Sequence, residues 1–273
     1  MAIERIYIPT YRRKRQHTWN NLPDKWKAIT YLVVDEQDRD ALKNNHNTIL
    51  CPAQGQGIVK VRQWIMENAR KKGFKFGVFD DDLIDIVKTR KENEPGLWNT
   101  RLAPAEYDDM FGMLSDWLDE VVTCGLEICW NPPISKMDKH FCFRQSGNHF
   151  FNGKTFPFDL IKWDIDCSED FYMTLQLLTN GYPNYISLRY RLRPDVTQAA
   201  GGCQASDRTI ETHNESMRFI QSQFPDFVKL SEKVAKTGKE WGGKTKLAAE
   251  IAWKKAYASS QKKQEATLEN FFS

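Results

Sequence analysis

The 273-residue sequence predicts an α/β fold, with a mostly parallel central sheet that carries helices on both of its faces. Two observations predict this fold. Runs of strand length alternate with helical stretches along residues 3–80, which is the pattern of a doubly wound sheet. Charged residues then gather directly behind several predicted strands, where the side chains of an open sheet project into a crevice that binds ligands.

The first two predicted strands are each followed by charged residues. Residues 3–8 alternate apolar and charged side chains, as a first strand should, and the basic run Arg12–Arg15 comes soon after them. Cations behind a strand suit a phosphate-bearing ligand, although a solvated basic loop explains the same run nearly as well. Residues 28–34 are continuously apolar, which is typical of a parallel strand buried on both faces, and Asp35 follows them.

A glycine-rich stretch, Gln54–Gly57, opens the next long helix, which is expected over residues 58–72. A short helix at 38–45 and a third strand at 48–51 precede it. Glycines at a helix start let backbone amides approach a ligand closely. The spacing matches neither the dinucleotide-binding motif nor the P-loop, so no particular ligand follows from it.

Three consecutive carboxylates, Asp80, Asp81 and Asp82, end the strand that begins at Phe74. Adjacent carboxylates repel one another, so the cluster makes sense mainly if a cation lies among them. Oxygen ligands suit hard ions such as Mg²⁺ or Mn²⁺, which keep several waters and bind substrate phosphates. An acidic turn in which one Asp caps the next helix explains the triplet about equally well.

A second acidic cluster, within residues 164–170, precedes a helix expected from Phe171 to Gly181. Carboxylates in the first turn of a helix interact favourably with its dipole, and either Ser168 or Asp166 is a natural N-cap. Capping explains one or two of these four acids, but it does not explain all four.

The remaining elements follow from the same patterns. Arg189, Arg191 and Arg193 line one side of the continuation of a strand at 185–188. The other expected elements are a polar, mobile loop over the site at 88–104, a helix at 105–123, strands at 128–130, 140–143 and 149–153, and a helix that follows Arg208 and carries His213.

The net charge of +3 is unevenly divided. Residues 228–273 hold ten Lys and five Glu, hence +5 (10 − 5), and the rest of the chain carries −2 (3 − 5). A basic tail suggests an anionic polymer as partner, although solvated surface helices are often Lys-rich.

No stretch of the sequence approaches the ~20 apolar residues of a membrane span, and the N-terminus lacks an apolar signal region. Zinc bound by Cys124, Cys129, Cys142 and His140 is conceivable, but the spacing fits no common finger. Free buried thiols are the favoured interpretation. We therefore expect a cytoplasmic protein with no membrane partner.

Several of these features, in this order, resemble a GT-A glycosyltransferase over about residues 3–227. They are Ile8-Pro9-Thr10 after the first strand, Asp35 after the second, Asp80-x-Asp82 after the fourth, and Glu169-Asp170 at a helix start. The resemblance implies a GT-A-like fold with a Rossmann-like nucleotide-binding half, and it leaves residues 228–273 as a Lys-rich helical C-terminal extension.

The resemblance also implies roles for the acids. Asp35 would contact the donor nucleobase, and Asp80 and Asp82 would hold Mn²⁺ or Mg²⁺ on the diphosphate of a sugar nucleotide. His213 would complete the metal shell, although an exposed helical histidine is the more common case. Asp170 would be the general base, with Glu169 as a positioning group beside it.

More narrowly, the Ile-Pro-Thr start, the Gln54–Gly57 helix entry, the Asp triplet and the Ser168–Phe171 block resemble phage glycosyltransferases that modify 5-hydroxymethylpyrimidines in DNA, including the group associated with TET-type hydroxylases. This resemblance implies a UDP-sugar donor, a DNA acceptor and inversion at the anomeric carbon. The implied donor-binding residues are Pro9, Thr10, Tyr11, Arg13, Asp35, Gly57, Arg62, Asp80 and Asp81. The implied acceptor-binding or DNA-binding residues are Trp163, Arg189, Arg191 and Arg208, of which Trp163 also fits a plain core position.

The chemistry supports this interpretation without the family. Sugar transfer needs a Lewis acid on the departing diphosphate and a carboxylate that takes the proton of the acceptor hydroxyl, and two acidic clusters can supply both. A metal-dependent nuclease or phosphotransferase would also use clustered acids, but no Lys or His base adjoins the triplet. A non-catalytic nucleic-acid-binding protein would explain the basic segments but not the acids, which DNA repels.

Overall fold

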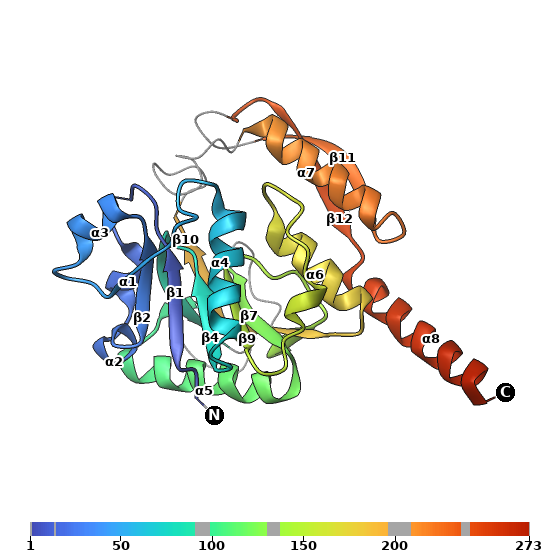
Figure 1. The fold of residues 1–273 in the computed structure, drawn as a ribbon, viewed down its shortest axis with the longest axis horizontal. Coiled ribbons are helices and arrows are strands. Elements are labelled where there is room, and N and C mark those ends of the chain that lie inside the picture. The colour runs from blue at the N-terminus through green and yellow to red at the C-terminus, as the bar shows by residue number, and fades with distance from the viewer. Residues whose placement is uncertain are drawn as a thin grey trace.

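The computed structural model of the chain describes residues 2–13, 15–90, 99–129, 137–195, 209–235 and 241–272. One large mixed sheet forms the centre of the molecule, and helices lie on both of its faces (Figure 1). The predicted α/β fold class is thus confirmed. Within these ranges, no helix combines the length and the apolar character that crossing a membrane requires.

The elements have the following bounds. The strands of the central sheet are β1 (Arg5–Pro9), β2 (Thr30–Val34), β3 (Thr48–Leu50), β4 (Lys75–Phe79), β5 (Leu83–Thr89), β6 (Asn99–Arg101), β7 (Thr123–Ile128), β8 (Lys139–Phe141), β9 (Asn148–Asn152) and β10 (Asn184–Pro194). The helices are α1 (His17–Asn21), α2 (Asp24–Lys27), α3 (Glu36–Leu42), α4 (Ile58–Arg70), α5 (Pro104–Glu120), α6 (Glu169–Thr179), α7 (Ile210–Gln223) and α8 (Trp253–Phe272), with a 3-10 turn η1 at Phe158–Leu160. Strands β11 (Val228–Val234) and β12 (Thr245–Ile251) form a separate hairpin.

The sheet has the strand order β3-β2-β1-β4-β9-β7-β10-β5-β6, with β8 also paired to β10. Strands β3, β2, β1 and β4 are parallel neighbours, β9 runs antiparallel to β4 and β7, and β10 runs parallel to β7. Among the described strands of this sheet, only β5, β8 and β9 run opposite to the rest. The carboxyl ends of β1, β2 and β4 therefore lie at one edge, where ligands of such sheets bind.

Two hydrophobic clusters hold the sheet between its helices. Side chains alternate between faces along a strand, so Ile6 and Ile8 of β1 pack in one cluster with Phe111 of α5. Tyr7 of β1 lies in the other cluster with Ile65 of α4. Burial of each such side chain stabilises the fold by about 1.5–3 kcal/mol. Both faces of the sheet therefore need a covering layer of helices, as predicted.

Two expectations about local structure were wrong. The expected loop at 88–104 instead contains the end of β5 and the edge strand β6, while residues 91–98 lie outside the described part of the chain. The extension at 228–273 was expected to be helical, but β11 and β12 pair as an antiparallel hairpin before α8 begins. Strand β11 has apolar residues only at Val228, Leu230 and Val234 and is exposed over most of its length, so its sequence carries no clear strand period.

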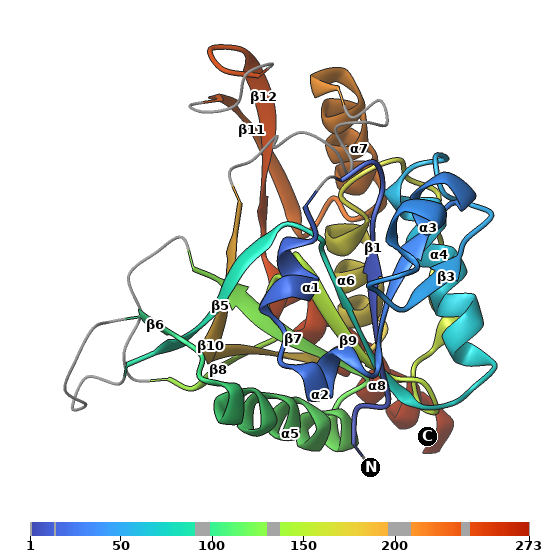
Figure 2. The ribbon, with the colours of Figure 1, turned by 90° about the vertical axis from the view of Figure 1, so that its left-hand side faces the viewer.

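The C-terminal segment packs on the body of the molecule. Val228 of β11 and Trp253 and Ala256 of α8 share a hydrophobic cluster with Leu175 of α6 and Met217 of α7. Figure 2 shows the β11–β12 hairpin rising above the sheet beside α7. The boundary at residue 227 stays a prediction, and the shared cluster ties the two sides of it together.

Candidate active site

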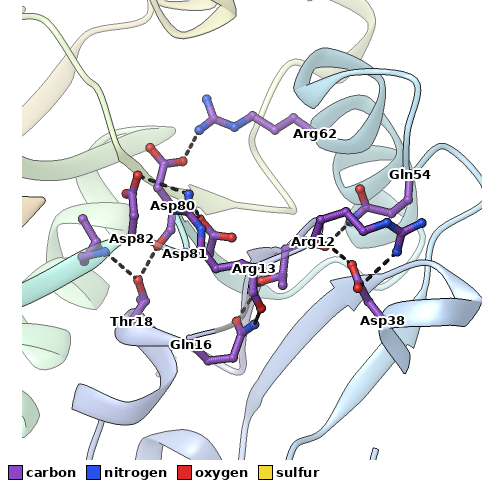
Figure 3. A network of polar contacts seen from close by, with 12 residues as sticks. Arg12, Arg13, Gln16, Thr18, Asp38, Gln54, Arg62, Asp80, Asp81 and Asp82 are labelled. Carbon is purple, nitrogen blue, oxygen red and sulfur yellow. Dashed lines mark hydrogen bonds and ion pairs between the residues drawn. The ribbon is translucent and has the colours of Figure 1, made fainter. Parts of the chain in front are cut away.

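The Asp triplet (Asp80–Asp82) lies directly behind the carboxyl end of β4. The backbone amide of Asp80 donates to the carbonyl of Gly147, 3.0 Å away. The Thr18 hydroxyl donates to the Asp80 carbonyl at 2.5 Å and accepts from the Leu83 amide at 3.0 Å (Figure 3). These bonds hold the turn that presents the three carboxylates.

Two arginines neutralise part of this cluster. Arg13 Nη2 lies 2.9 Å from Asp81 Oδ1 and 3.5 Å from Asp82 Oδ2. Arg62, from the first turns of α4, places Nη2 2.6 Å from Asp80 Oδ1. Figure 3 shows both guanidinium groups pointing at the triplet from different elements. A chain segment behind β1 and a helix thus converge on the end of β4.

The remaining negative charge is incompletely compensated. Burial is the main reason why the pKa of Asp81 is raised to about 6, with Arg13 acting in the opposite direction. Burial and the charges of Asp80 and Asp81 raise the pKa of Asp82 to about 7. Asp81 Oδ2 is buried without a hydrogen-bond partner. A cation among these oxygens would relieve both the repulsion and the unsatisfied atom.

The second acidic pair begins α6 and faces the triplet through Arg62. The other guanidinium nitrogen of Arg62 bonds Glu169 Oε1, so one side chain joins the two clusters. Ser168 occupies the N-cap position with φ +60°, but its side chain makes no capping bond. Asp170 Oδ1 accepts from the amide of Phe171 at 2.9 Å.

The favourable interaction with the helix dipole does not keep the pKa of Asp170 low. Burial, and then the neighbouring Glu169, raise its pKa to about 7, although Arg62 acts in the opposite direction. The carboxyl group is therefore poised to gain or lose a proton near neutral pH. A residue with that property suits general acid–base catalysis.

A third group of contacts lies behind β1 and β2. Arg12 Nη2 contacts Asp35 Oδ2 at 2.6 Å, and Nη1 contacts Asp38 Oδ1 at 3.1 Å. Asp35 also caps α3 by accepting from the Asp38 amide at 2.8 Å. Burial raises the pKa of Asp35, but the bonds from Arg12 and the backbone outweigh it and hold the pKa below its usual value.

Comparison with known families now decides the class. The family model described as "TET-Associated Glycosyltransferase" matches residues 4–202, which is most of the chain. The chain belongs to the TET-associated glycosyltransferase family. It is therefore an enzyme that transfers a sugar, and the nuclease and the non-catalytic alternatives are set aside.

Two curated relatives of this TET-associated glycosyltransferase are the "Beta-glucosyl-HMC-alpha-glucosyl-transferase" proteins of Enterobacteria phages T6 and T2. Each is 23% identical over 207 residues, which is 72% of this chain and 72% of the relative. Solved structures with some likeness include Staphylococcus aureus TarS residues 1–349, with 14% identity and a TM-score of 0.47 over 82% of this chain and 65% of that one. GalNAc-T7 with UDP, GalNAc and Mn²⁺ shows 11% identity and a TM-score of 0.39 over 83% and 51%.

The structure brings most of the predicted donor-binding residues of the glycosyltransferase to one sheet edge. Pro9 ends β1, and the carbonyl of Thr10 accepts from Gln54 Nε2 at 3.0 Å. A Cβ atom added at Gly55 would lie 3.4 Å from the Tyr11 hydroxyl, so Tyr11 packs on the glycine-rich stretch. Gly57 precedes α4 with φ +94°, a conformation that favours glycine.

The predicted acceptor residues of the glycosyltransferase divide into three cases. Trp163 lies beside the acid pair, because it lines a pocket together with Asp170. Arg189 and Arg191 contribute to the fold instead, donating to the carbonyls of Thr89 at 3.0 Å and Ile128 at 3.3 Å. Arg191 is only 4% exposed, which disfavours the predicted contact with the acceptor or DNA. Arg208 lies outside the described residues.

The predicted metal ligands differ in their surroundings. His213 Nε2 lies 2.9 Å from the Leu247 carbonyl, and its ring packs against Trp241. In the part of the chain that the structure describes, no three His, Cys, Asp or Glu side chains gather as a metal site. Asp80 and Asp82 still fit a divalent ion, because Mg²⁺ is commonly held by one or two carboxylates plus phosphate oxygens and waters.

Sequence reasoning missed several residues of this edge, including Thr18, Asp38 and His149. Thr18 and Asp38 act through contacts with distant segments that no local pattern reveals. His149 lies in β9 between Asn148 and Phe150 and gave no signal beyond that of a core strand.

Proposed function

We propose that this glycosyltransferase moves a sugar from a UDP-sugar to the hydroxyl of a 5-hydroxymethylpyrimidine in DNA. The observation that carries the proposal is the single guanidinium of Arg62, which joins the Asp80 and Glu169 clusters at one sheet edge. The carboxylates proposed to hold the donor and the acid pair proposed to supply the base therefore lie side by side. The names of the relatives of phages T2 and T6 specify β-glucosyl-HMC, which supports an acceptor derived from a hydroxymethylated base.

The donor would lie along the carboxyl ends of β1, β2 and β4. Asp35, which follows β2, would contact the nucleobase. Arg13, which pairs with Asp81, would bind the donor phosphates when the diphosphate competes with Asp81 for its guanidinium. Asp80 and Asp82 would hold Mn²⁺ or Mg²⁺, which when bound supplies a Lewis acid for the leaving diphosphate. Tyr11 and the α4 amides behind Gly57 complete the wall of this site.

Asp170 is the proposed general base. The acceptor hydroxyl gives its proton to the Asp170 carboxylate while its oxygen forms a bond to the anomeric carbon. The bond from that carbon to the diphosphate oxygen breaks, and the nucleoside diphosphate leaves with the electron pair. Glu169, held by Arg62, would orient the first turn of α6, and after burial it is the next cause that raises the pKa of Asp170.

A single displacement with one base inverts the anomeric carbon, and we propose inversion. The relatives are named for α-glucosyl transfer, and an α product from an α-linked donor would mean retention instead. The anomeric configuration of the product, measured by NMR, therefore decides this part of the proposal.

Asp170→Asn tests the assignment of the site. The variant keeps the shape of the side chain and its bond from the Phe171 amide but removes the basicity. We expect kcat to fall by ~10²–10⁴, while metal-dependent UDP affinity and Tm change little. A variant that loses stability but keeps its kcat would show a merely structural acid. If Glu169→Gln shows the selective loss of kcat instead, the base is the neighbouring residue.

A further inference from the structure

Two arginines converge on one buried carboxylate in the part of the sheet that lies away from β2 and β3. Asp85 of β5 is directly opposite Arg193 of β10, whose Nη2 bonds Asp85 Oδ2. Arg101 of β6 places Nε 2.9 Å from Asp85 Oδ1. The side chain of Asp85 is 8% exposed, whereas those of Arg101 and Arg193 are 61% and 55% exposed. A buried acid thus holds two guanidinium groups at the surface.

This cluster carries more positive charge than the acid requires. One arginine is enough to neutralise one carboxylate, as in the Arg70–Asp159 pair. With Arg101 and Arg193 both at Asp85, the cluster has a net charge of +1 (2 − 1), and the two cations repel each other. An anion bound between the guanidinium groups would relieve that repulsion.

Most N–H groups of these two arginines have no acceptor within the described residues. A guanidinium has five N–H donors. In that part of the chain, Asp85 is the polar partner of Arg193, and Arg101 has Asp85 and the side-chain oxygen of Asn21, 2.7 Å from its Nη2. Asp85 Oδ1 accepts no hydrogen bond there, so the contact of Arg101 Nε with it is an ion pair without the geometry of a hydrogen bond. The remaining donors suit phosphate oxygens, which arginine often binds through two parallel hydrogen bonds.

The arginine pair lies close to the Asp triplet. Strand β5 begins at Leu83, directly behind Asp82, so Asp85 is three residues, or about 10 Å, along the chain from Asp82. The amide of Asp195, two residues beyond Arg193, donates to the Asp82 carbonyl at 2.8 Å. In the strand order, β10, β5 and β6 lie on the other side of β4 from β1 and β2 (Figure 2). The pair therefore flanks the Asp triplet on the side away from the proposed nucleotide site.

We propose that Arg101 and Arg193 bind a backbone phosphate of the acceptor DNA, next to the nucleotide that receives the sugar. This inference rests on the proposed function and adds to it the residues that hold the DNA strand at the site. Phosphate contacts fix the register of a protein on DNA without reading its sequence. The donor diphosphate is the other source of phosphate at this edge, but its proposed place is beside Arg13 and Arg62, on the β1 side of the triplet.

The test measures DNA affinity by fluorescence anisotropy over a series of salt concentrations. One labelled duplex carries a single 5-hydroxymethylcytosine and a second carries plain cytosine. Arg101→Gln and Arg193→Gln each remove one cation and leave Asp85 with the other, and Arg193→Lys keeps the charge. Arg70→Gln is the matched control, because it removes an arginine of similar exposure from an ion pair in the last turn of α4. The Tm of each variant, its UDP affinity with Mn²⁺ and its KM for the hydroxymethylated duplex are measured alongside.

Each glutamine variant should reduce the slope of log affinity against log salt concentration by roughly 0.7–0.9. The reduction should be equal for both duplexes, because a phosphate contact is independent of the base. The KM for the hydroxymethylated duplex should rise while kcat and UDP affinity stay unchanged. Arg193→Lys should keep the wild-type slope, and Arg70→Gln should change neither the slope nor the KM.

Wild-type slopes in both glutamine variants would overturn the inference. A loss of slope in Arg193→Lys as large as that in Arg193→Gln would also overturn it, since the lysine variant keeps the charge. A lower UDP affinity in the glutamine variants would assign the pair to the donor phosphates instead. The wild type judges the proposed function separately: if it glycosylates the hydroxymethylated duplex, that function stands whatever the variants do. A wild type that binds neither duplex would overturn both.

Discussion

Replacing Arg62 by glutamine removes the only guanidinium that joins Asp80 to Glu169 in the described residues. The side chains of Arg62 and Glu169 are 11% and 8% exposed, so the variant leaves a buried carboxylate without its partner. Removing one partner of a buried ion pair costs about 3–5 kcal/mol. We expect about 3 kcal/mol, because the side chain of Asp80 is 36% exposed and water compensates it partly. Such a loss lowers Tm by roughly 6–12 °C in a domain of this size.

The loss should also depend on pH. A carboxyl group whose folded pKa is raised binds more protons when folded, so it makes the fold less stable as pH rises from the unfolded pKa to the folded one. The pKa of Asp170 is about 7 with Arg62 present and should rise further without it. The difference in Tm between variant and wild type should therefore be smaller at pH 6 than at pH 8.5.

The matched control lies two turns further along α4. Arg70 pairs with Asp159, but these side chains are 50% and 82% exposed, and solvent screens exposed ion pairs so that they contribute little to stability. Arg70→Gln should change Tm little, and equally at both pH values. Equal losses for Arg62→Gln and Arg70→Gln, or a loss for Arg62→Gln that is the same at pH 6 and 8.5, would refute the reasoning.

Two further predictions follow from the site and the extension. Asp82→Asn should abolish turnover and the Mn²⁺-dependent part of UDP affinity. Mn²⁺ should stabilise the wild type more at pH 8 than at pH 5.5, because protons compete with the ion for Asp82, whose pKa is about 7. Activity of the Asp82 variant in EDTA would contradict this assignment. If the exposed Lys254, Lys255 and Lys262 contact phosphates, replacing all three by Glu should weaken DNA binding. The slope of log affinity against log salt concentration should fall by roughly 0.7–0.9 per lost contact. An unchanged slope at unchanged Tm would show that α8 does not bind DNA.

The sequence was sufficient to predict the parallel strands and the acids behind them. Two of these signals lie in the order of neighbouring residues, so they can be recognised without a structure. They are the continuous apolar residues of β2 and the abrupt change to carboxylates after Phe79. The start of α6 near Glu169 was predictable for the same reason, because acids prefer the first turn of a helix.

Other features depend on contacts between distant segments. Arg62 was predicted as a donor-binding residue, but its bond to Glu169, 107 positions away, follows only from the packing of α4 beside α6. His149 lies in β9, a short strand that is buried throughout, where an imidazole and a phenyl ring give the same pattern. The edge strand β6 is polar because one side of it faces solvent, and its sequence therefore resembled a loop.

The most direct test of the proposed activity is the intact mass of a duplex oligonucleotide that carries one 5-hydroxymethylcytosine, after incubation with the enzyme, Mn²⁺ and a panel of UDP-sugars. A second duplex that carries plain cytosine is the control. The proposed function predicts a mass gain of one glycosyl residue on the hydroxymethylated strand alone, with one UDP released for each residue transferred. Unchanged oligonucleotide masses with every sugar, or UDP release without a gain of mass on the DNA, would contradict it.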